Sequence, residues 1–528
     1  MNYKVILLDG VDAVCGKIFK QRGFEVTEAP KMPVEELESV ISDYDAMVVR
    51  SATKVTADLL EKAKKMQVVG RAGVGVDNID LDAATRQGVL VMNTPDGNTI
   101  STAEHTCGMI LALSRNIPAA VASLKEGRWD RKKYLGTEVH GKTLGIVGLG
   151  KIGSNVAQRM KSFGMNVVGF DPYTTHERAA EMGVEMMELD DLIASVDYLT
   201  VHTPLTDQTR NLISLKNADR IKPGIRLVNC ARGGIYKEDD LVPLIEKGIV
   251  NGVALDVYSK EPPEGELAEM VKHPAIISTP HLGASTQEAQ SKVAEQVATQ
   301  IADAIEQKGF QGSLNGKSIA LSTNKEVQPF LELSERFGRF LSQIAPKHIN
   351  ELSINFSGAC AKHSEVITDS LLAGFMSDNV DEIVNLINAR YFAESRGLKI
   401  SETLSKESKT YSDLISVDLG PKAVYRKLSA TPFGDKDYRI VSIDGFSIEI
   451  HLDGDIIIYR NIDKPGMLAA TSGALAERSI NIASLSLGRD LKDAHAITAF
   501  TVDTKPDATD LDHLQLIEGV HTVRYISM

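Results

Sequence analysis

The sequence predicts an α/β fold with two doubly wound, Rossmann-like parallel sheets, followed by two smaller α+β domains. The chain has 528 residues, whereas domains usually run to about 100–200 residues and a single core stops growing near about 300. We therefore expect three or four domains. Short apolar runs alternate with amphipathic stretches over 1–97 and again over 142–280, which is typical of parallel sheets covered by helices.

The first series has its apolar runs in KVILLD, DAMVVRS and QVVGRAG, with helices expected near 34–41 and 56–65. Small and apolar residues at helical spacing predict a helix over 98–116 that leads into the second series. A further helix is expected over 284–308, and the turn formers in GFQGSLNGKS after it predict a domain boundary near 310–318.

The rest of the chain predicts two further domains. Residues 318–453 have α/β patterning without a catalytic motif. A compact segment over 454–528 begins with the strand DIIIYR.

The composition and net charge of the chain limit the classes of function and partner that it can have. The chain is 43% hydrophobic and 24% charged, as expected for an ordinary folded protein. Its net charge of -13 argues against nucleic acid as a partner, because binding a phosphate backbone needs a basic field. An anionic substrate would have to be held by local Arg and Lys side chains.

The sequence also predicts a cytoplasmic protein without a membrane partner, a metal site or disulfides. No apolar run approaches the roughly 20 residues that span a bilayer, and the opening MNYKVILLDG is typical of a β-strand rather than a signal peptide. Cys15, Cys107, Cys230 and Cys360 are widely spaced and form no C-x-x-C pair, so we expect free thiols.

A dinucleotide site is predicted where the strand in KTLGIVGLGKIGSNVAQRM runs through Gly148, Gly150 and Gly153 into a helix. These glycines permit a tight turn and a close approach of backbone to pyrophosphate at a helix N-terminus. The next strand ends in Asp171, where a carboxylate can accept hydrogen bonds from the adenosine ribose and would repel a 2′-phosphate. The cofactor is therefore predicted to be NAD rather than NADP.

A second glycine cluster, with Gly73 and Gly75 in GRAGVGVDN, lacks the third glycine and does not lead into a helix. It is interpreted as a backbone loop facing substrate, with a plain turn as the equally good alternative.

Three polar residues follow the ends of predicted strands in the second series: Arg232, Glu261 and His281. Ligands of open α/β sheets bind outside the carboxyl ends of the strands, so these side chains are expected to converge. His281 suits a base that accepts a hydroxyl proton, Glu261 would orient its imidazole, and Arg232 offers a fork for a carboxylate. Taken singly, each is more commonly a turn, loop or surface residue.

Their order along the chain favours the catalytic reading. V-N-C-A-R-G-G, D-V-Y-S-K-E-P and P-H-L-G-A-S-T resemble the signature segments of the D-isomer-specific 2-hydroxyacid dehydrogenase family, a resemblance that covers about residues 1–316. It implies catalytic roles for Arg232, Glu261 and His281. It also implies further cofactor contacts at Lys151, Ile152, Thr203, Cys230, Ala231, Arg232, Asp256, His281, Leu282, Gly283 and Ala284. The implied domains are a discontinuous substrate-binding domain of 1–97 and 284–316 and an NAD-binding domain of 98–283.

The local basic groups point to a phosphorylated substrate. Arg50 in R-S-A-T-K and Arg131 in R-W-D-R-K-K are surface charges if taken singly, but their segments resemble the phosphate-binding and lid segments of the phosphoglycerate dehydrogenases. That resemblance implies 3-phosphoglycerate as substrate, held by Arg50, by the backbone of Gly75 and, across a homodimer or homotetramer, by Arg131.

The C-terminal segment with the turn D-K-P-G resembles an ACT domain over 454–528, and 317–453 resembles the intervening regulatory domain of the long phosphoglycerate dehydrogenases. This implies L-serine as effector, bound between two ACT domains by Asn461, Asp463 and Asn481. Those residues are also common in turns and caps, which is the alternative.

Three hypotheses remain open from the sequence. The first is oxidation of 3-phosphoglycerate with NAD, regulated through the C-terminal domain. The second is a dehydrogenase for another 2-hydroxyacid, such as 2-hydroxyglutarate. The third is a non-enzymatic protein that senses NADH, because corepressors exist on the same scaffold.

Overall fold

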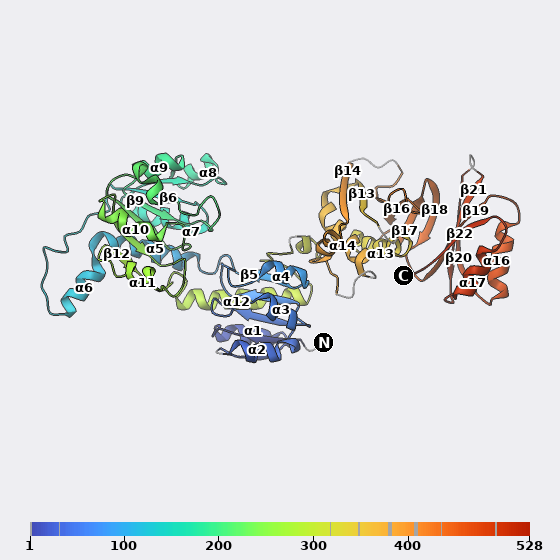
Figure 1. Cartoon of the computed structure of the whole chain (residues 1–528), viewed down its shortest axis with the longest axis horizontal. Helices are drawn as coiled ribbons and strands as arrows, with labels where there is room; N and C mark the ends of the chain where they lie inside the picture. Colours follow the sequence, from blue (N-terminus) through green and yellow to red (C-terminus); the bar gives the residue numbers. More distant parts are fainter. Residues whose placement is uncertain are drawn as a thin grey trace.

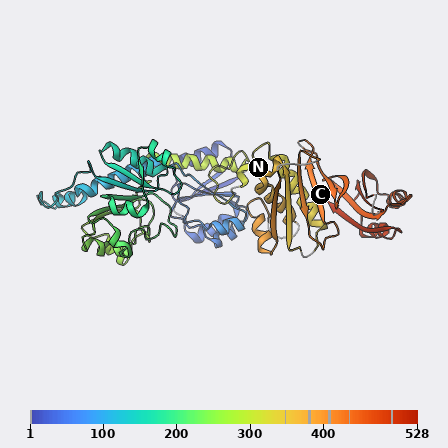
Figure 2. The same cartoon turned by 90° about the horizontal axis from the view of Figure 1, so that it is seen from above.

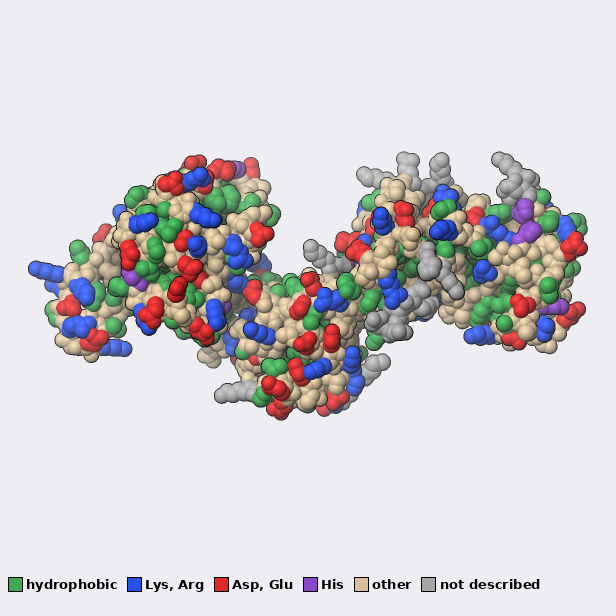
Figure 3. Space-filling view, viewed as in Figure 1, with side chains coloured by type: hydrophobic (Ala, Val, Ile, Leu, Met, Phe, Trp, Pro, Cys, Tyr) green, Lys and Arg blue, Asp and Glu red, His purple; other side chains and the backbone are tan. Residues whose placement is uncertain are grey.

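A computed structural model describes the chain except residues 1, 2, 31, 317, 347, 348, 378–382, 406–409, 435 and 491–493, and the side chains of Ser318 and Asp490. The expected boundary between 316 and 317 thus touches a residue outside the described set. The chain forms an elongated row of sheets with helices packed on them (Figures 1 and 2). On the face in Figure 3, Lys and Arg side chains are interspersed with Asp and Glu.

The first sheet is parallel, with strand order β2-β1-β3-β4-β5. Its elements are β1 Lys4–Leu7, α1 Ala13–Gln21, β2 Glu25–Glu28, α2 Val34–Val40, β3 Ala46–Val49, α3 Ala57–Lys62, β4 Val68–Arg71, α4 Leu81–Arg86 and β5 Leu90–Asn93. Neither α1 nor β2 was expected from the sequence; β2 (EVTE) has Val26 as its one apolar residue, so it lacks the apolar run of a buried strand.

Helix α12 (Gln287–Ile305) returns to this first sheet after the second one is complete. Its buried Val297 and Ile301 lie in one core with Val5 and Val68 of β1 and β4. The chain therefore crosses back to its N-terminal part, as the family resemblance implied, while the domain boundaries stay predictions.

The second sheet is also parallel, with order β12-β11-β10-β9-β6-β7-β8. Its elements are β6 Thr143–Val147, α7 Lys151–Ser162, β7 Asn166–Phe170, α8 His176–Glu181, β8 Glu185–Met186, α9 Leu189–Ser195, β9 Tyr198–Val201, β10 Ile225–Asn229, α10 Glu238–Glu246, β11 Val250–Leu255, α11 Glu266–Met270 and β12 Ile276–Ser278. The strand order reverses beside β6, which is where such sheets bind ligands.

Helices α5 (Thr99–Arg115) and α6 (Ile117–Lys125) connect the two sheets, and α6 extends away from the body (Figure 1). On α6 the apolar side chains of Ile117, Val121 and Leu124 are 47%, 47% and 58% exposed. In the described part of the chain no single helix is long and apolar enough to cross a membrane, and only α5 and α6 taken together, across a 64° bend, meet that test.

The C-terminal half holds two sheets, of order β14-β13-β15-β16-β17-β18 and β20-β21-β19-β22. The first contains α13 Gln328–Ile344, β13 Glu351–Gly358, α14 Ser364–Ser377, α15 Ala389–Ser395, β14 Lys399–Ser405, β15 Asp413–Asp418, β16 Lys427–Pro432, β17 Tyr438–Ile443 and β18 Phe446–His451. The second contains β19 Asp455–Ile462, α16 Met467–Glu477, β20 Ile482–Asp490, β21 His495–Val502, α17 Ala508–Gln515 and β22 Val520–Ser527, in the order βαββαβ.

These two sheets share one hydrophobic core. Ile456 and Ile458 of β19 and Ile497 of β21 belong to the cluster that contains Phe337 of α13 and Ile440 of β17. The face of the last sheet opposite its helices therefore packs on the preceding unit. The predicted fold class, two Rossmann-like sheets with two smaller α+β units, is confirmed, but the two smaller units are not packed independently.

The C-terminal half contacts the first sheet through two asparagines. The amide of Asn385 donates to the carbonyl of Gly88 at 2.9 Å, and that of Asn388 donates to the carbonyl of Arg86 at 3.4 Å. Both carbonyls lie at the end of α4 and in the turn after it, so this contact caps that helix.

Candidate active site

The three glycines of the predicted cofactor loop have distinct structural roles. Gly148 has a φ of +95°, and a Cβ there would lie 2.6 Å from the carbonyl oxygen of His202. A Cβ on Gly153 would lie 2.0 Å from the carbonyl oxygen of Gly148, so close packing of helix on strand requires glycine. Gly150, the N-cap of α7, faces open space. The loop thus leaves room for a pyrophosphate at the start of a helix.

Asp171 follows β7 beside this loop. Its carboxylate accepts the backbone N–H of Leu149 and of Tyr173, each at 2.8 Å. Two such bonds fix its orientation and leave lone pairs for ribose hydroxyls.

The other predicted cofactor residues border the same end of the sheet. Lys151 and Ile152 open α7, with Lys151 paired to Asp96, and Thr203 follows β9 with a buried hydroxyl that has no partner among the described residues. Cys230 and Ala231 follow β10, Asp256 follows β11, and 281–284 follow β12. The residues present therefore fit a dinucleotide.

His281 and Glu261 form an ion pair, with 2.8 Å between Nδ1 and Oε2. The hydrogen bond to Glu261 raises the pKa of His281 above its ordinary value, against the opposing effect of burial. Burial raises the pKa of Glu261, but the bond and charge of His281 outweigh it and lower this pKa overall. Because Nδ1 faces the carboxylate, Nε2 remains to exchange a proton with a substrate.

The backbone of His281 has a φ of +54°. A non-glycine residue in that region stores of order 1–3 kcal/mol and persists where its surroundings hold it.

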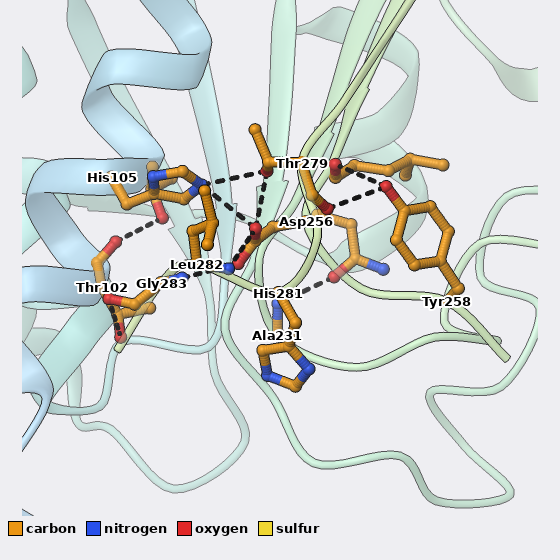
Figure 4. A network of polar contacts seen from close by, with 12 residues as sticks. Thr102, His105, Ala231, Asp256, Tyr258, Thr279, His281, Leu282 and Gly283 are labelled. Atoms are coloured by element: carbon orange, nitrogen blue, oxygen red, sulfur yellow. Dashed lines mark hydrogen bonds and ion pairs between the residues drawn. The ribbon is translucent and has the colours of Figure 1, made fainter. Parts of the chain in front are cut away.

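Asp256 is the group that holds the loop after His281. It is 0% exposed, and its Oδ1 accepts from Leu282 N at 2.7 Å and from the Thr279 hydroxyl at 2.6 Å. Its Oδ2 accepts from Gly283 N at 2.8 Å. Figure 4 shows the carboxylate between this loop and His105 of α5.

Arg232 lies against the second glycine cluster, which joins the two sheets at the site. A Cβ on Gly75 would lie 2.0 Å from Nη2 of Arg232, so a side chain at this position would displace the guanidinium. The guanidinium also contacts Asp77, at 3.3 Å from Nε. The loop thus contacts a predicted catalytic side chain, while its interpretations as a substrate-facing loop and as a plain turn both stay predictions.

A further arginine, Arg71, lies at the end of β4 and was missed by the sequence analysis. Burial lowers its pKa to about 10, and the like charges of Arg232 and Arg50 add to the effect. Its Nε is buried without a hydrogen-bond partner among the described residues. Its position at the carboxyl end of a strand was the available signal, but GRAG was interpreted through its glycines alone.

The loop that carries Arg50 is fixed by its neighbours. Asp9 accepts the backbone N–H of Arg50 at 2.8 Å and the hydroxyl of Thr53 at 2.6 Å. Asn78 donates to the Arg50 carbonyl at 2.8 Å. Arg50, Arg71 and Arg232 thus form a cationic cluster in an acidic protein.

The structure does not bring Arg131 to this cluster within one chain, because it lies exposed in the loop after α6. The four cysteines are buried free thiols.

Of the three predicted effector residues, Asn461 and Asp463 lie together at the end of β19, whereas Asn481 lies apart from them, before the start of β20. Asp463 follows β19 and pairs with Arg489, at 2.7 Å from Nε, near the end of β20. Asn481 precedes the start of β20 and donates to Asp503 at 2.5 Å. Asn461 is only 3% exposed, and its amide donates to the Ile462 carbonyl at 2.8 Å.

Comparison with known proteins bears on all four parts of the chain. Three family models match: the NAD binding domain of D-isomer specific 2-hydroxyacid dehydrogenases over 107–283, the intervening domain of D-3-phosphoglycerate dehydrogenase over 326–444, and the ACT domain over 455–519. Among solved structures, a D-lactate dehydrogenase from Aquifex aeolicus complexed with NAD and lactic acid is 25% identical, with a TM-score of 0.51, covering 58% of this chain and 96% of that one. A glyoxylate reductase from Paecilomyes thermophila is 28% identical, with a TM-score of 0.54, covering 60% and 99%.

Curated relatives match over nearly the whole length. D-3-phosphoglycerate dehydrogenase from Bacillus subtilis is 40% identical over 94% of both chains. The enzyme of that name from Archaeoglobus fulgidus is 37% identical over 99% of this chain and 100% of its own, and that from Homo sapiens is 39% identical over 91% of both.

Fold and site together define an NAD-dependent dehydrogenase of D-2-hydroxy acids. With relatives of this identity and coverage, the chain belongs to the D-3-phosphoglycerate dehydrogenase family. The predictions of the family, the enzyme class and the cofactor are confirmed.

Proposed function

We propose that the chain oxidises 3-phospho-D-glycerate to 3-phosphohydroxypyruvate by hydride transfer from C2, the first step of L-serine biosynthesis. The observation that carries the proposal is the position of Arg232, which contacts the Gly75 loop and lies close enough to His281 and Arg71 for their charges to interact. The His281–Glu261 pair and the cationic cluster are therefore near one another. The names of the relatives support the same substrate.

Each residue of the site has a separate role in the proposed reaction. Nε2 of His281 takes the proton of the substrate hydroxyl, and Glu261 stabilises the imidazolium that forms. Arg232 binds the substrate carboxylate and polarises the developing carbonyl oxygen. NAD, when bound, accepts the hydride from C2.

Arg50 and Arg71 are the residues we assign to the anionic end of the substrate. A buried guanidinium with an unpartnered Nε, beside two like charges, is stabilised by a dianion at hydrogen-bond distance. Gly75 would contribute its backbone.

The cofactor would be held by Gly148, Gly150, Gly153 and Asp171 at its adenosine and pyrophosphate end, as argued above for their geometry. The residues after β9, β10, β11 and β12 would line its nicotinamide end.

The substrate assignment predicts a selective effect of Arg50→Ala. The Michaelis constant for 3-phosphoglycerate should rise by about 10- to 100-fold, the worth of one hydrogen bond between charged groups, while that for D-glycerate, which lacks the phosphate, should change little. Steady-state assays of both acids measure this difference. Lys62→Ala, which removes an exposed cation of α3, is the control. Equal effects on both acids would assign Arg50 a structural role.

The same wild-type assay separates the alternatives. Turnover of 3-phosphoglycerate well above that of 2-hydroxyglutarate supports the proposal, and the reverse ranking supports a dehydrogenase for another 2-hydroxyacid. NADH binding without turnover of either acid would leave the NADH-sensing, corepressor-like role.

A homodimer is proposed through helix α6. The three exposed apolar side chains of this projecting helix support an interaction surface there. A second copy of the chain bound at helix α6 would cover the exposed loop that carries Arg131. Arg131 would then face the substrate of the partner chain. A homotetramer would need a further contact.

Feedback by L-serine through the last sheet is proposed as well. Strand β20 is at the edge of that sheet, so the last sheets of two chains can lie side by side along it. Antiparallel edges would bring Asp463 of one chain to Asn481 of the other and give the effector an acid for its ammonium and an amide for its carboxylate. Asn461 supports this set least, because its amide is turned inward.

Asn481→Ala tests this regulation. Serine must bind the inhibited state more tightly than the active one, and loss of one amide contact should raise the inhibitory concentration about 5- to 10-fold. Serine titration of the wild type, of Asn481→Ala and of the exposed control Asp512→Asn on α17 measures it. No inhibition of the wild type removes the regulation, and unchanged inhibition of Asn481→Ala removes this site.

A further inference from the structure

His105 on α5 contacts the polar network behind the catalytic loop and has no role in the proposed mechanism so far. Its Nε2 lies 3.2 Å from Oδ1 of Asp256 and 3.2 Å from the hydroxyl oxygen of Thr279. The side chain is 22% exposed, whereas the Asp256 side chain is 1% exposed. A nitrogen lone pair would be repelled by the carboxylate, so this Nε2 carries a proton and donates it.

The hydrogen bond from His105 stabilises Asp256, because this carboxylate is buried and ionised. Burial raises the pKa of Asp256, but the bonds from His105, Thr279 and the backbone of Leu282 and Gly283 lower it overall. Each of these donors stabilises the charge, and each fixes the direction of one carboxylate oxygen.

The orientation of Asp256 affects the reacting atoms through His281, the residue that precedes the two N–H groups bound by Asp256. The N–H groups of Leu282 and Gly283 that it holds follow directly after His281, whose φ is +54°. Thr102, one turn before His105 on α5, also donates to the Gly283 carbonyl at 3.3 Å. Two side chains of helix α5, Thr102 and His105, thus contact the loop and the carboxylate that holds it (Figure 4).

We propose that His105 is a positioning residue for hydride transfer. It donates to Asp256, and Asp256 holds loop 279–283 so that the imidazole of His281 stays aligned between Glu261 and the substrate. His105 itself touches no reacting atom. This inference rests on the proposed role of His281 as the base.

Two substitutions distinguish an effect of the hydrogen bond that His105 donates from an effect of the packing of its side chain. His105→Leu removes the donor, so kcat should fall about tenfold, with the Michaelis constant for 3-phosphoglycerate changed less than about twofold because the cationic cluster lies elsewhere. His105→Gln keeps an N–H at a similar reach, so kcat should return to within about threefold of wild type. Glu104→Leu, next on the same helix and 63% exposed at its side chain, is the matched control.

Wild-type kcat in His105→Leu would overturn the inference, and so would equal losses in the Leu and Gln variants. Thermal melting checks that each variant is folded. If His105→Leu does not fold, His105→Glu replaces it. Glu matches Gln in shape but places a second carboxylate beside Asp256, so the kcat of His105→Glu should fall well below the kcat of His105→Gln. Full activity in His281→Ala would contradict the proposed function instead, which keeps the two failures distinct.

Discussion

His281→Ala should lower kcat for 3-phosphoglycerate oxidation by about 10²- to 10⁴-fold, the usual contribution of a positioned base. The hydroxyl proton must leave as hydride departs from C2, and Nε2 of His281 is the acceptor that the Glu261 pair makes available. NADH binding, followed by fluorescence, should change little. A variant with near wild-type turnover would contradict the assignment.

The pH dependence of kcat/KM tests the His281–Glu261 pair independently. Oxidation requires neutral His281, so kcat/KM should fall as the pH drops through a pKa above the ordinary 6.5, because Glu261 raises it. Glu261→Gln removes the carboxylate that stabilises the imidazolium, so the acidic limb should move to lower pH. A limb that moves to higher pH, or stays in place, would exclude this coupling.

Arg232→Gln should lower kcat/KM for 3-phosphoglycerate by about 10²- to 10³-fold. Two charge-assisted hydrogen bonds from the guanidinium fork, to carboxylate and carbonyl oxygen, contribute about 1.5–3 kcal/mol each, and Arg71 and Arg50 remain to retain part of the binding. Because one of these bonds strengthens as the carbonyl forms, kcat should fall along with the affinity.

Arg226→Gln is the matched control for this change, since Arg226 lies on β10, the strand that leads to Arg232, and donates to Thr137 at 3.1 Å. Its kcat/KM should stay within about threefold of wild type. A loss in Arg232→Gln no larger than in this control would remove Arg232 from the site.

The sequence identified the parts of the site that depend on local geometry. Gly148 and Gly153 need to be glycine for contacts within one strand-turn-helix unit, so their spacing was sufficient to find them. Arg232, Glu261 and His281 each follow a strand of the same parallel sheet, and the rule for strand ends brings them together.

The sequence did not identify contacts between distant segments. Arg71 comes from the first sheet and Arg232 from the second, so their proximity depends on how the two sheets pack together, which no local pattern reveals. His105 lies on helix α5, which was identified by its apolar spacing, and nothing local marks this side chain as a partner of Asp256. The partners of Asp463 and Asn481 likewise depend on strand register in the last sheet.

The core that the last two sheets share has a mechanical consequence. Because Ile456, Ile458 and Ile497 are packed into the same interior as Phe337, sliding one sheet over the other would open apolar cavities, and that is costly. The two units are therefore expected to move as one body, which contacts the first sheet through Asn385 and Asn388. Any displacement of this body relative to the first sheet would act at the C-terminal end of helix α4, the helix that follows the loop in contact with Arg232.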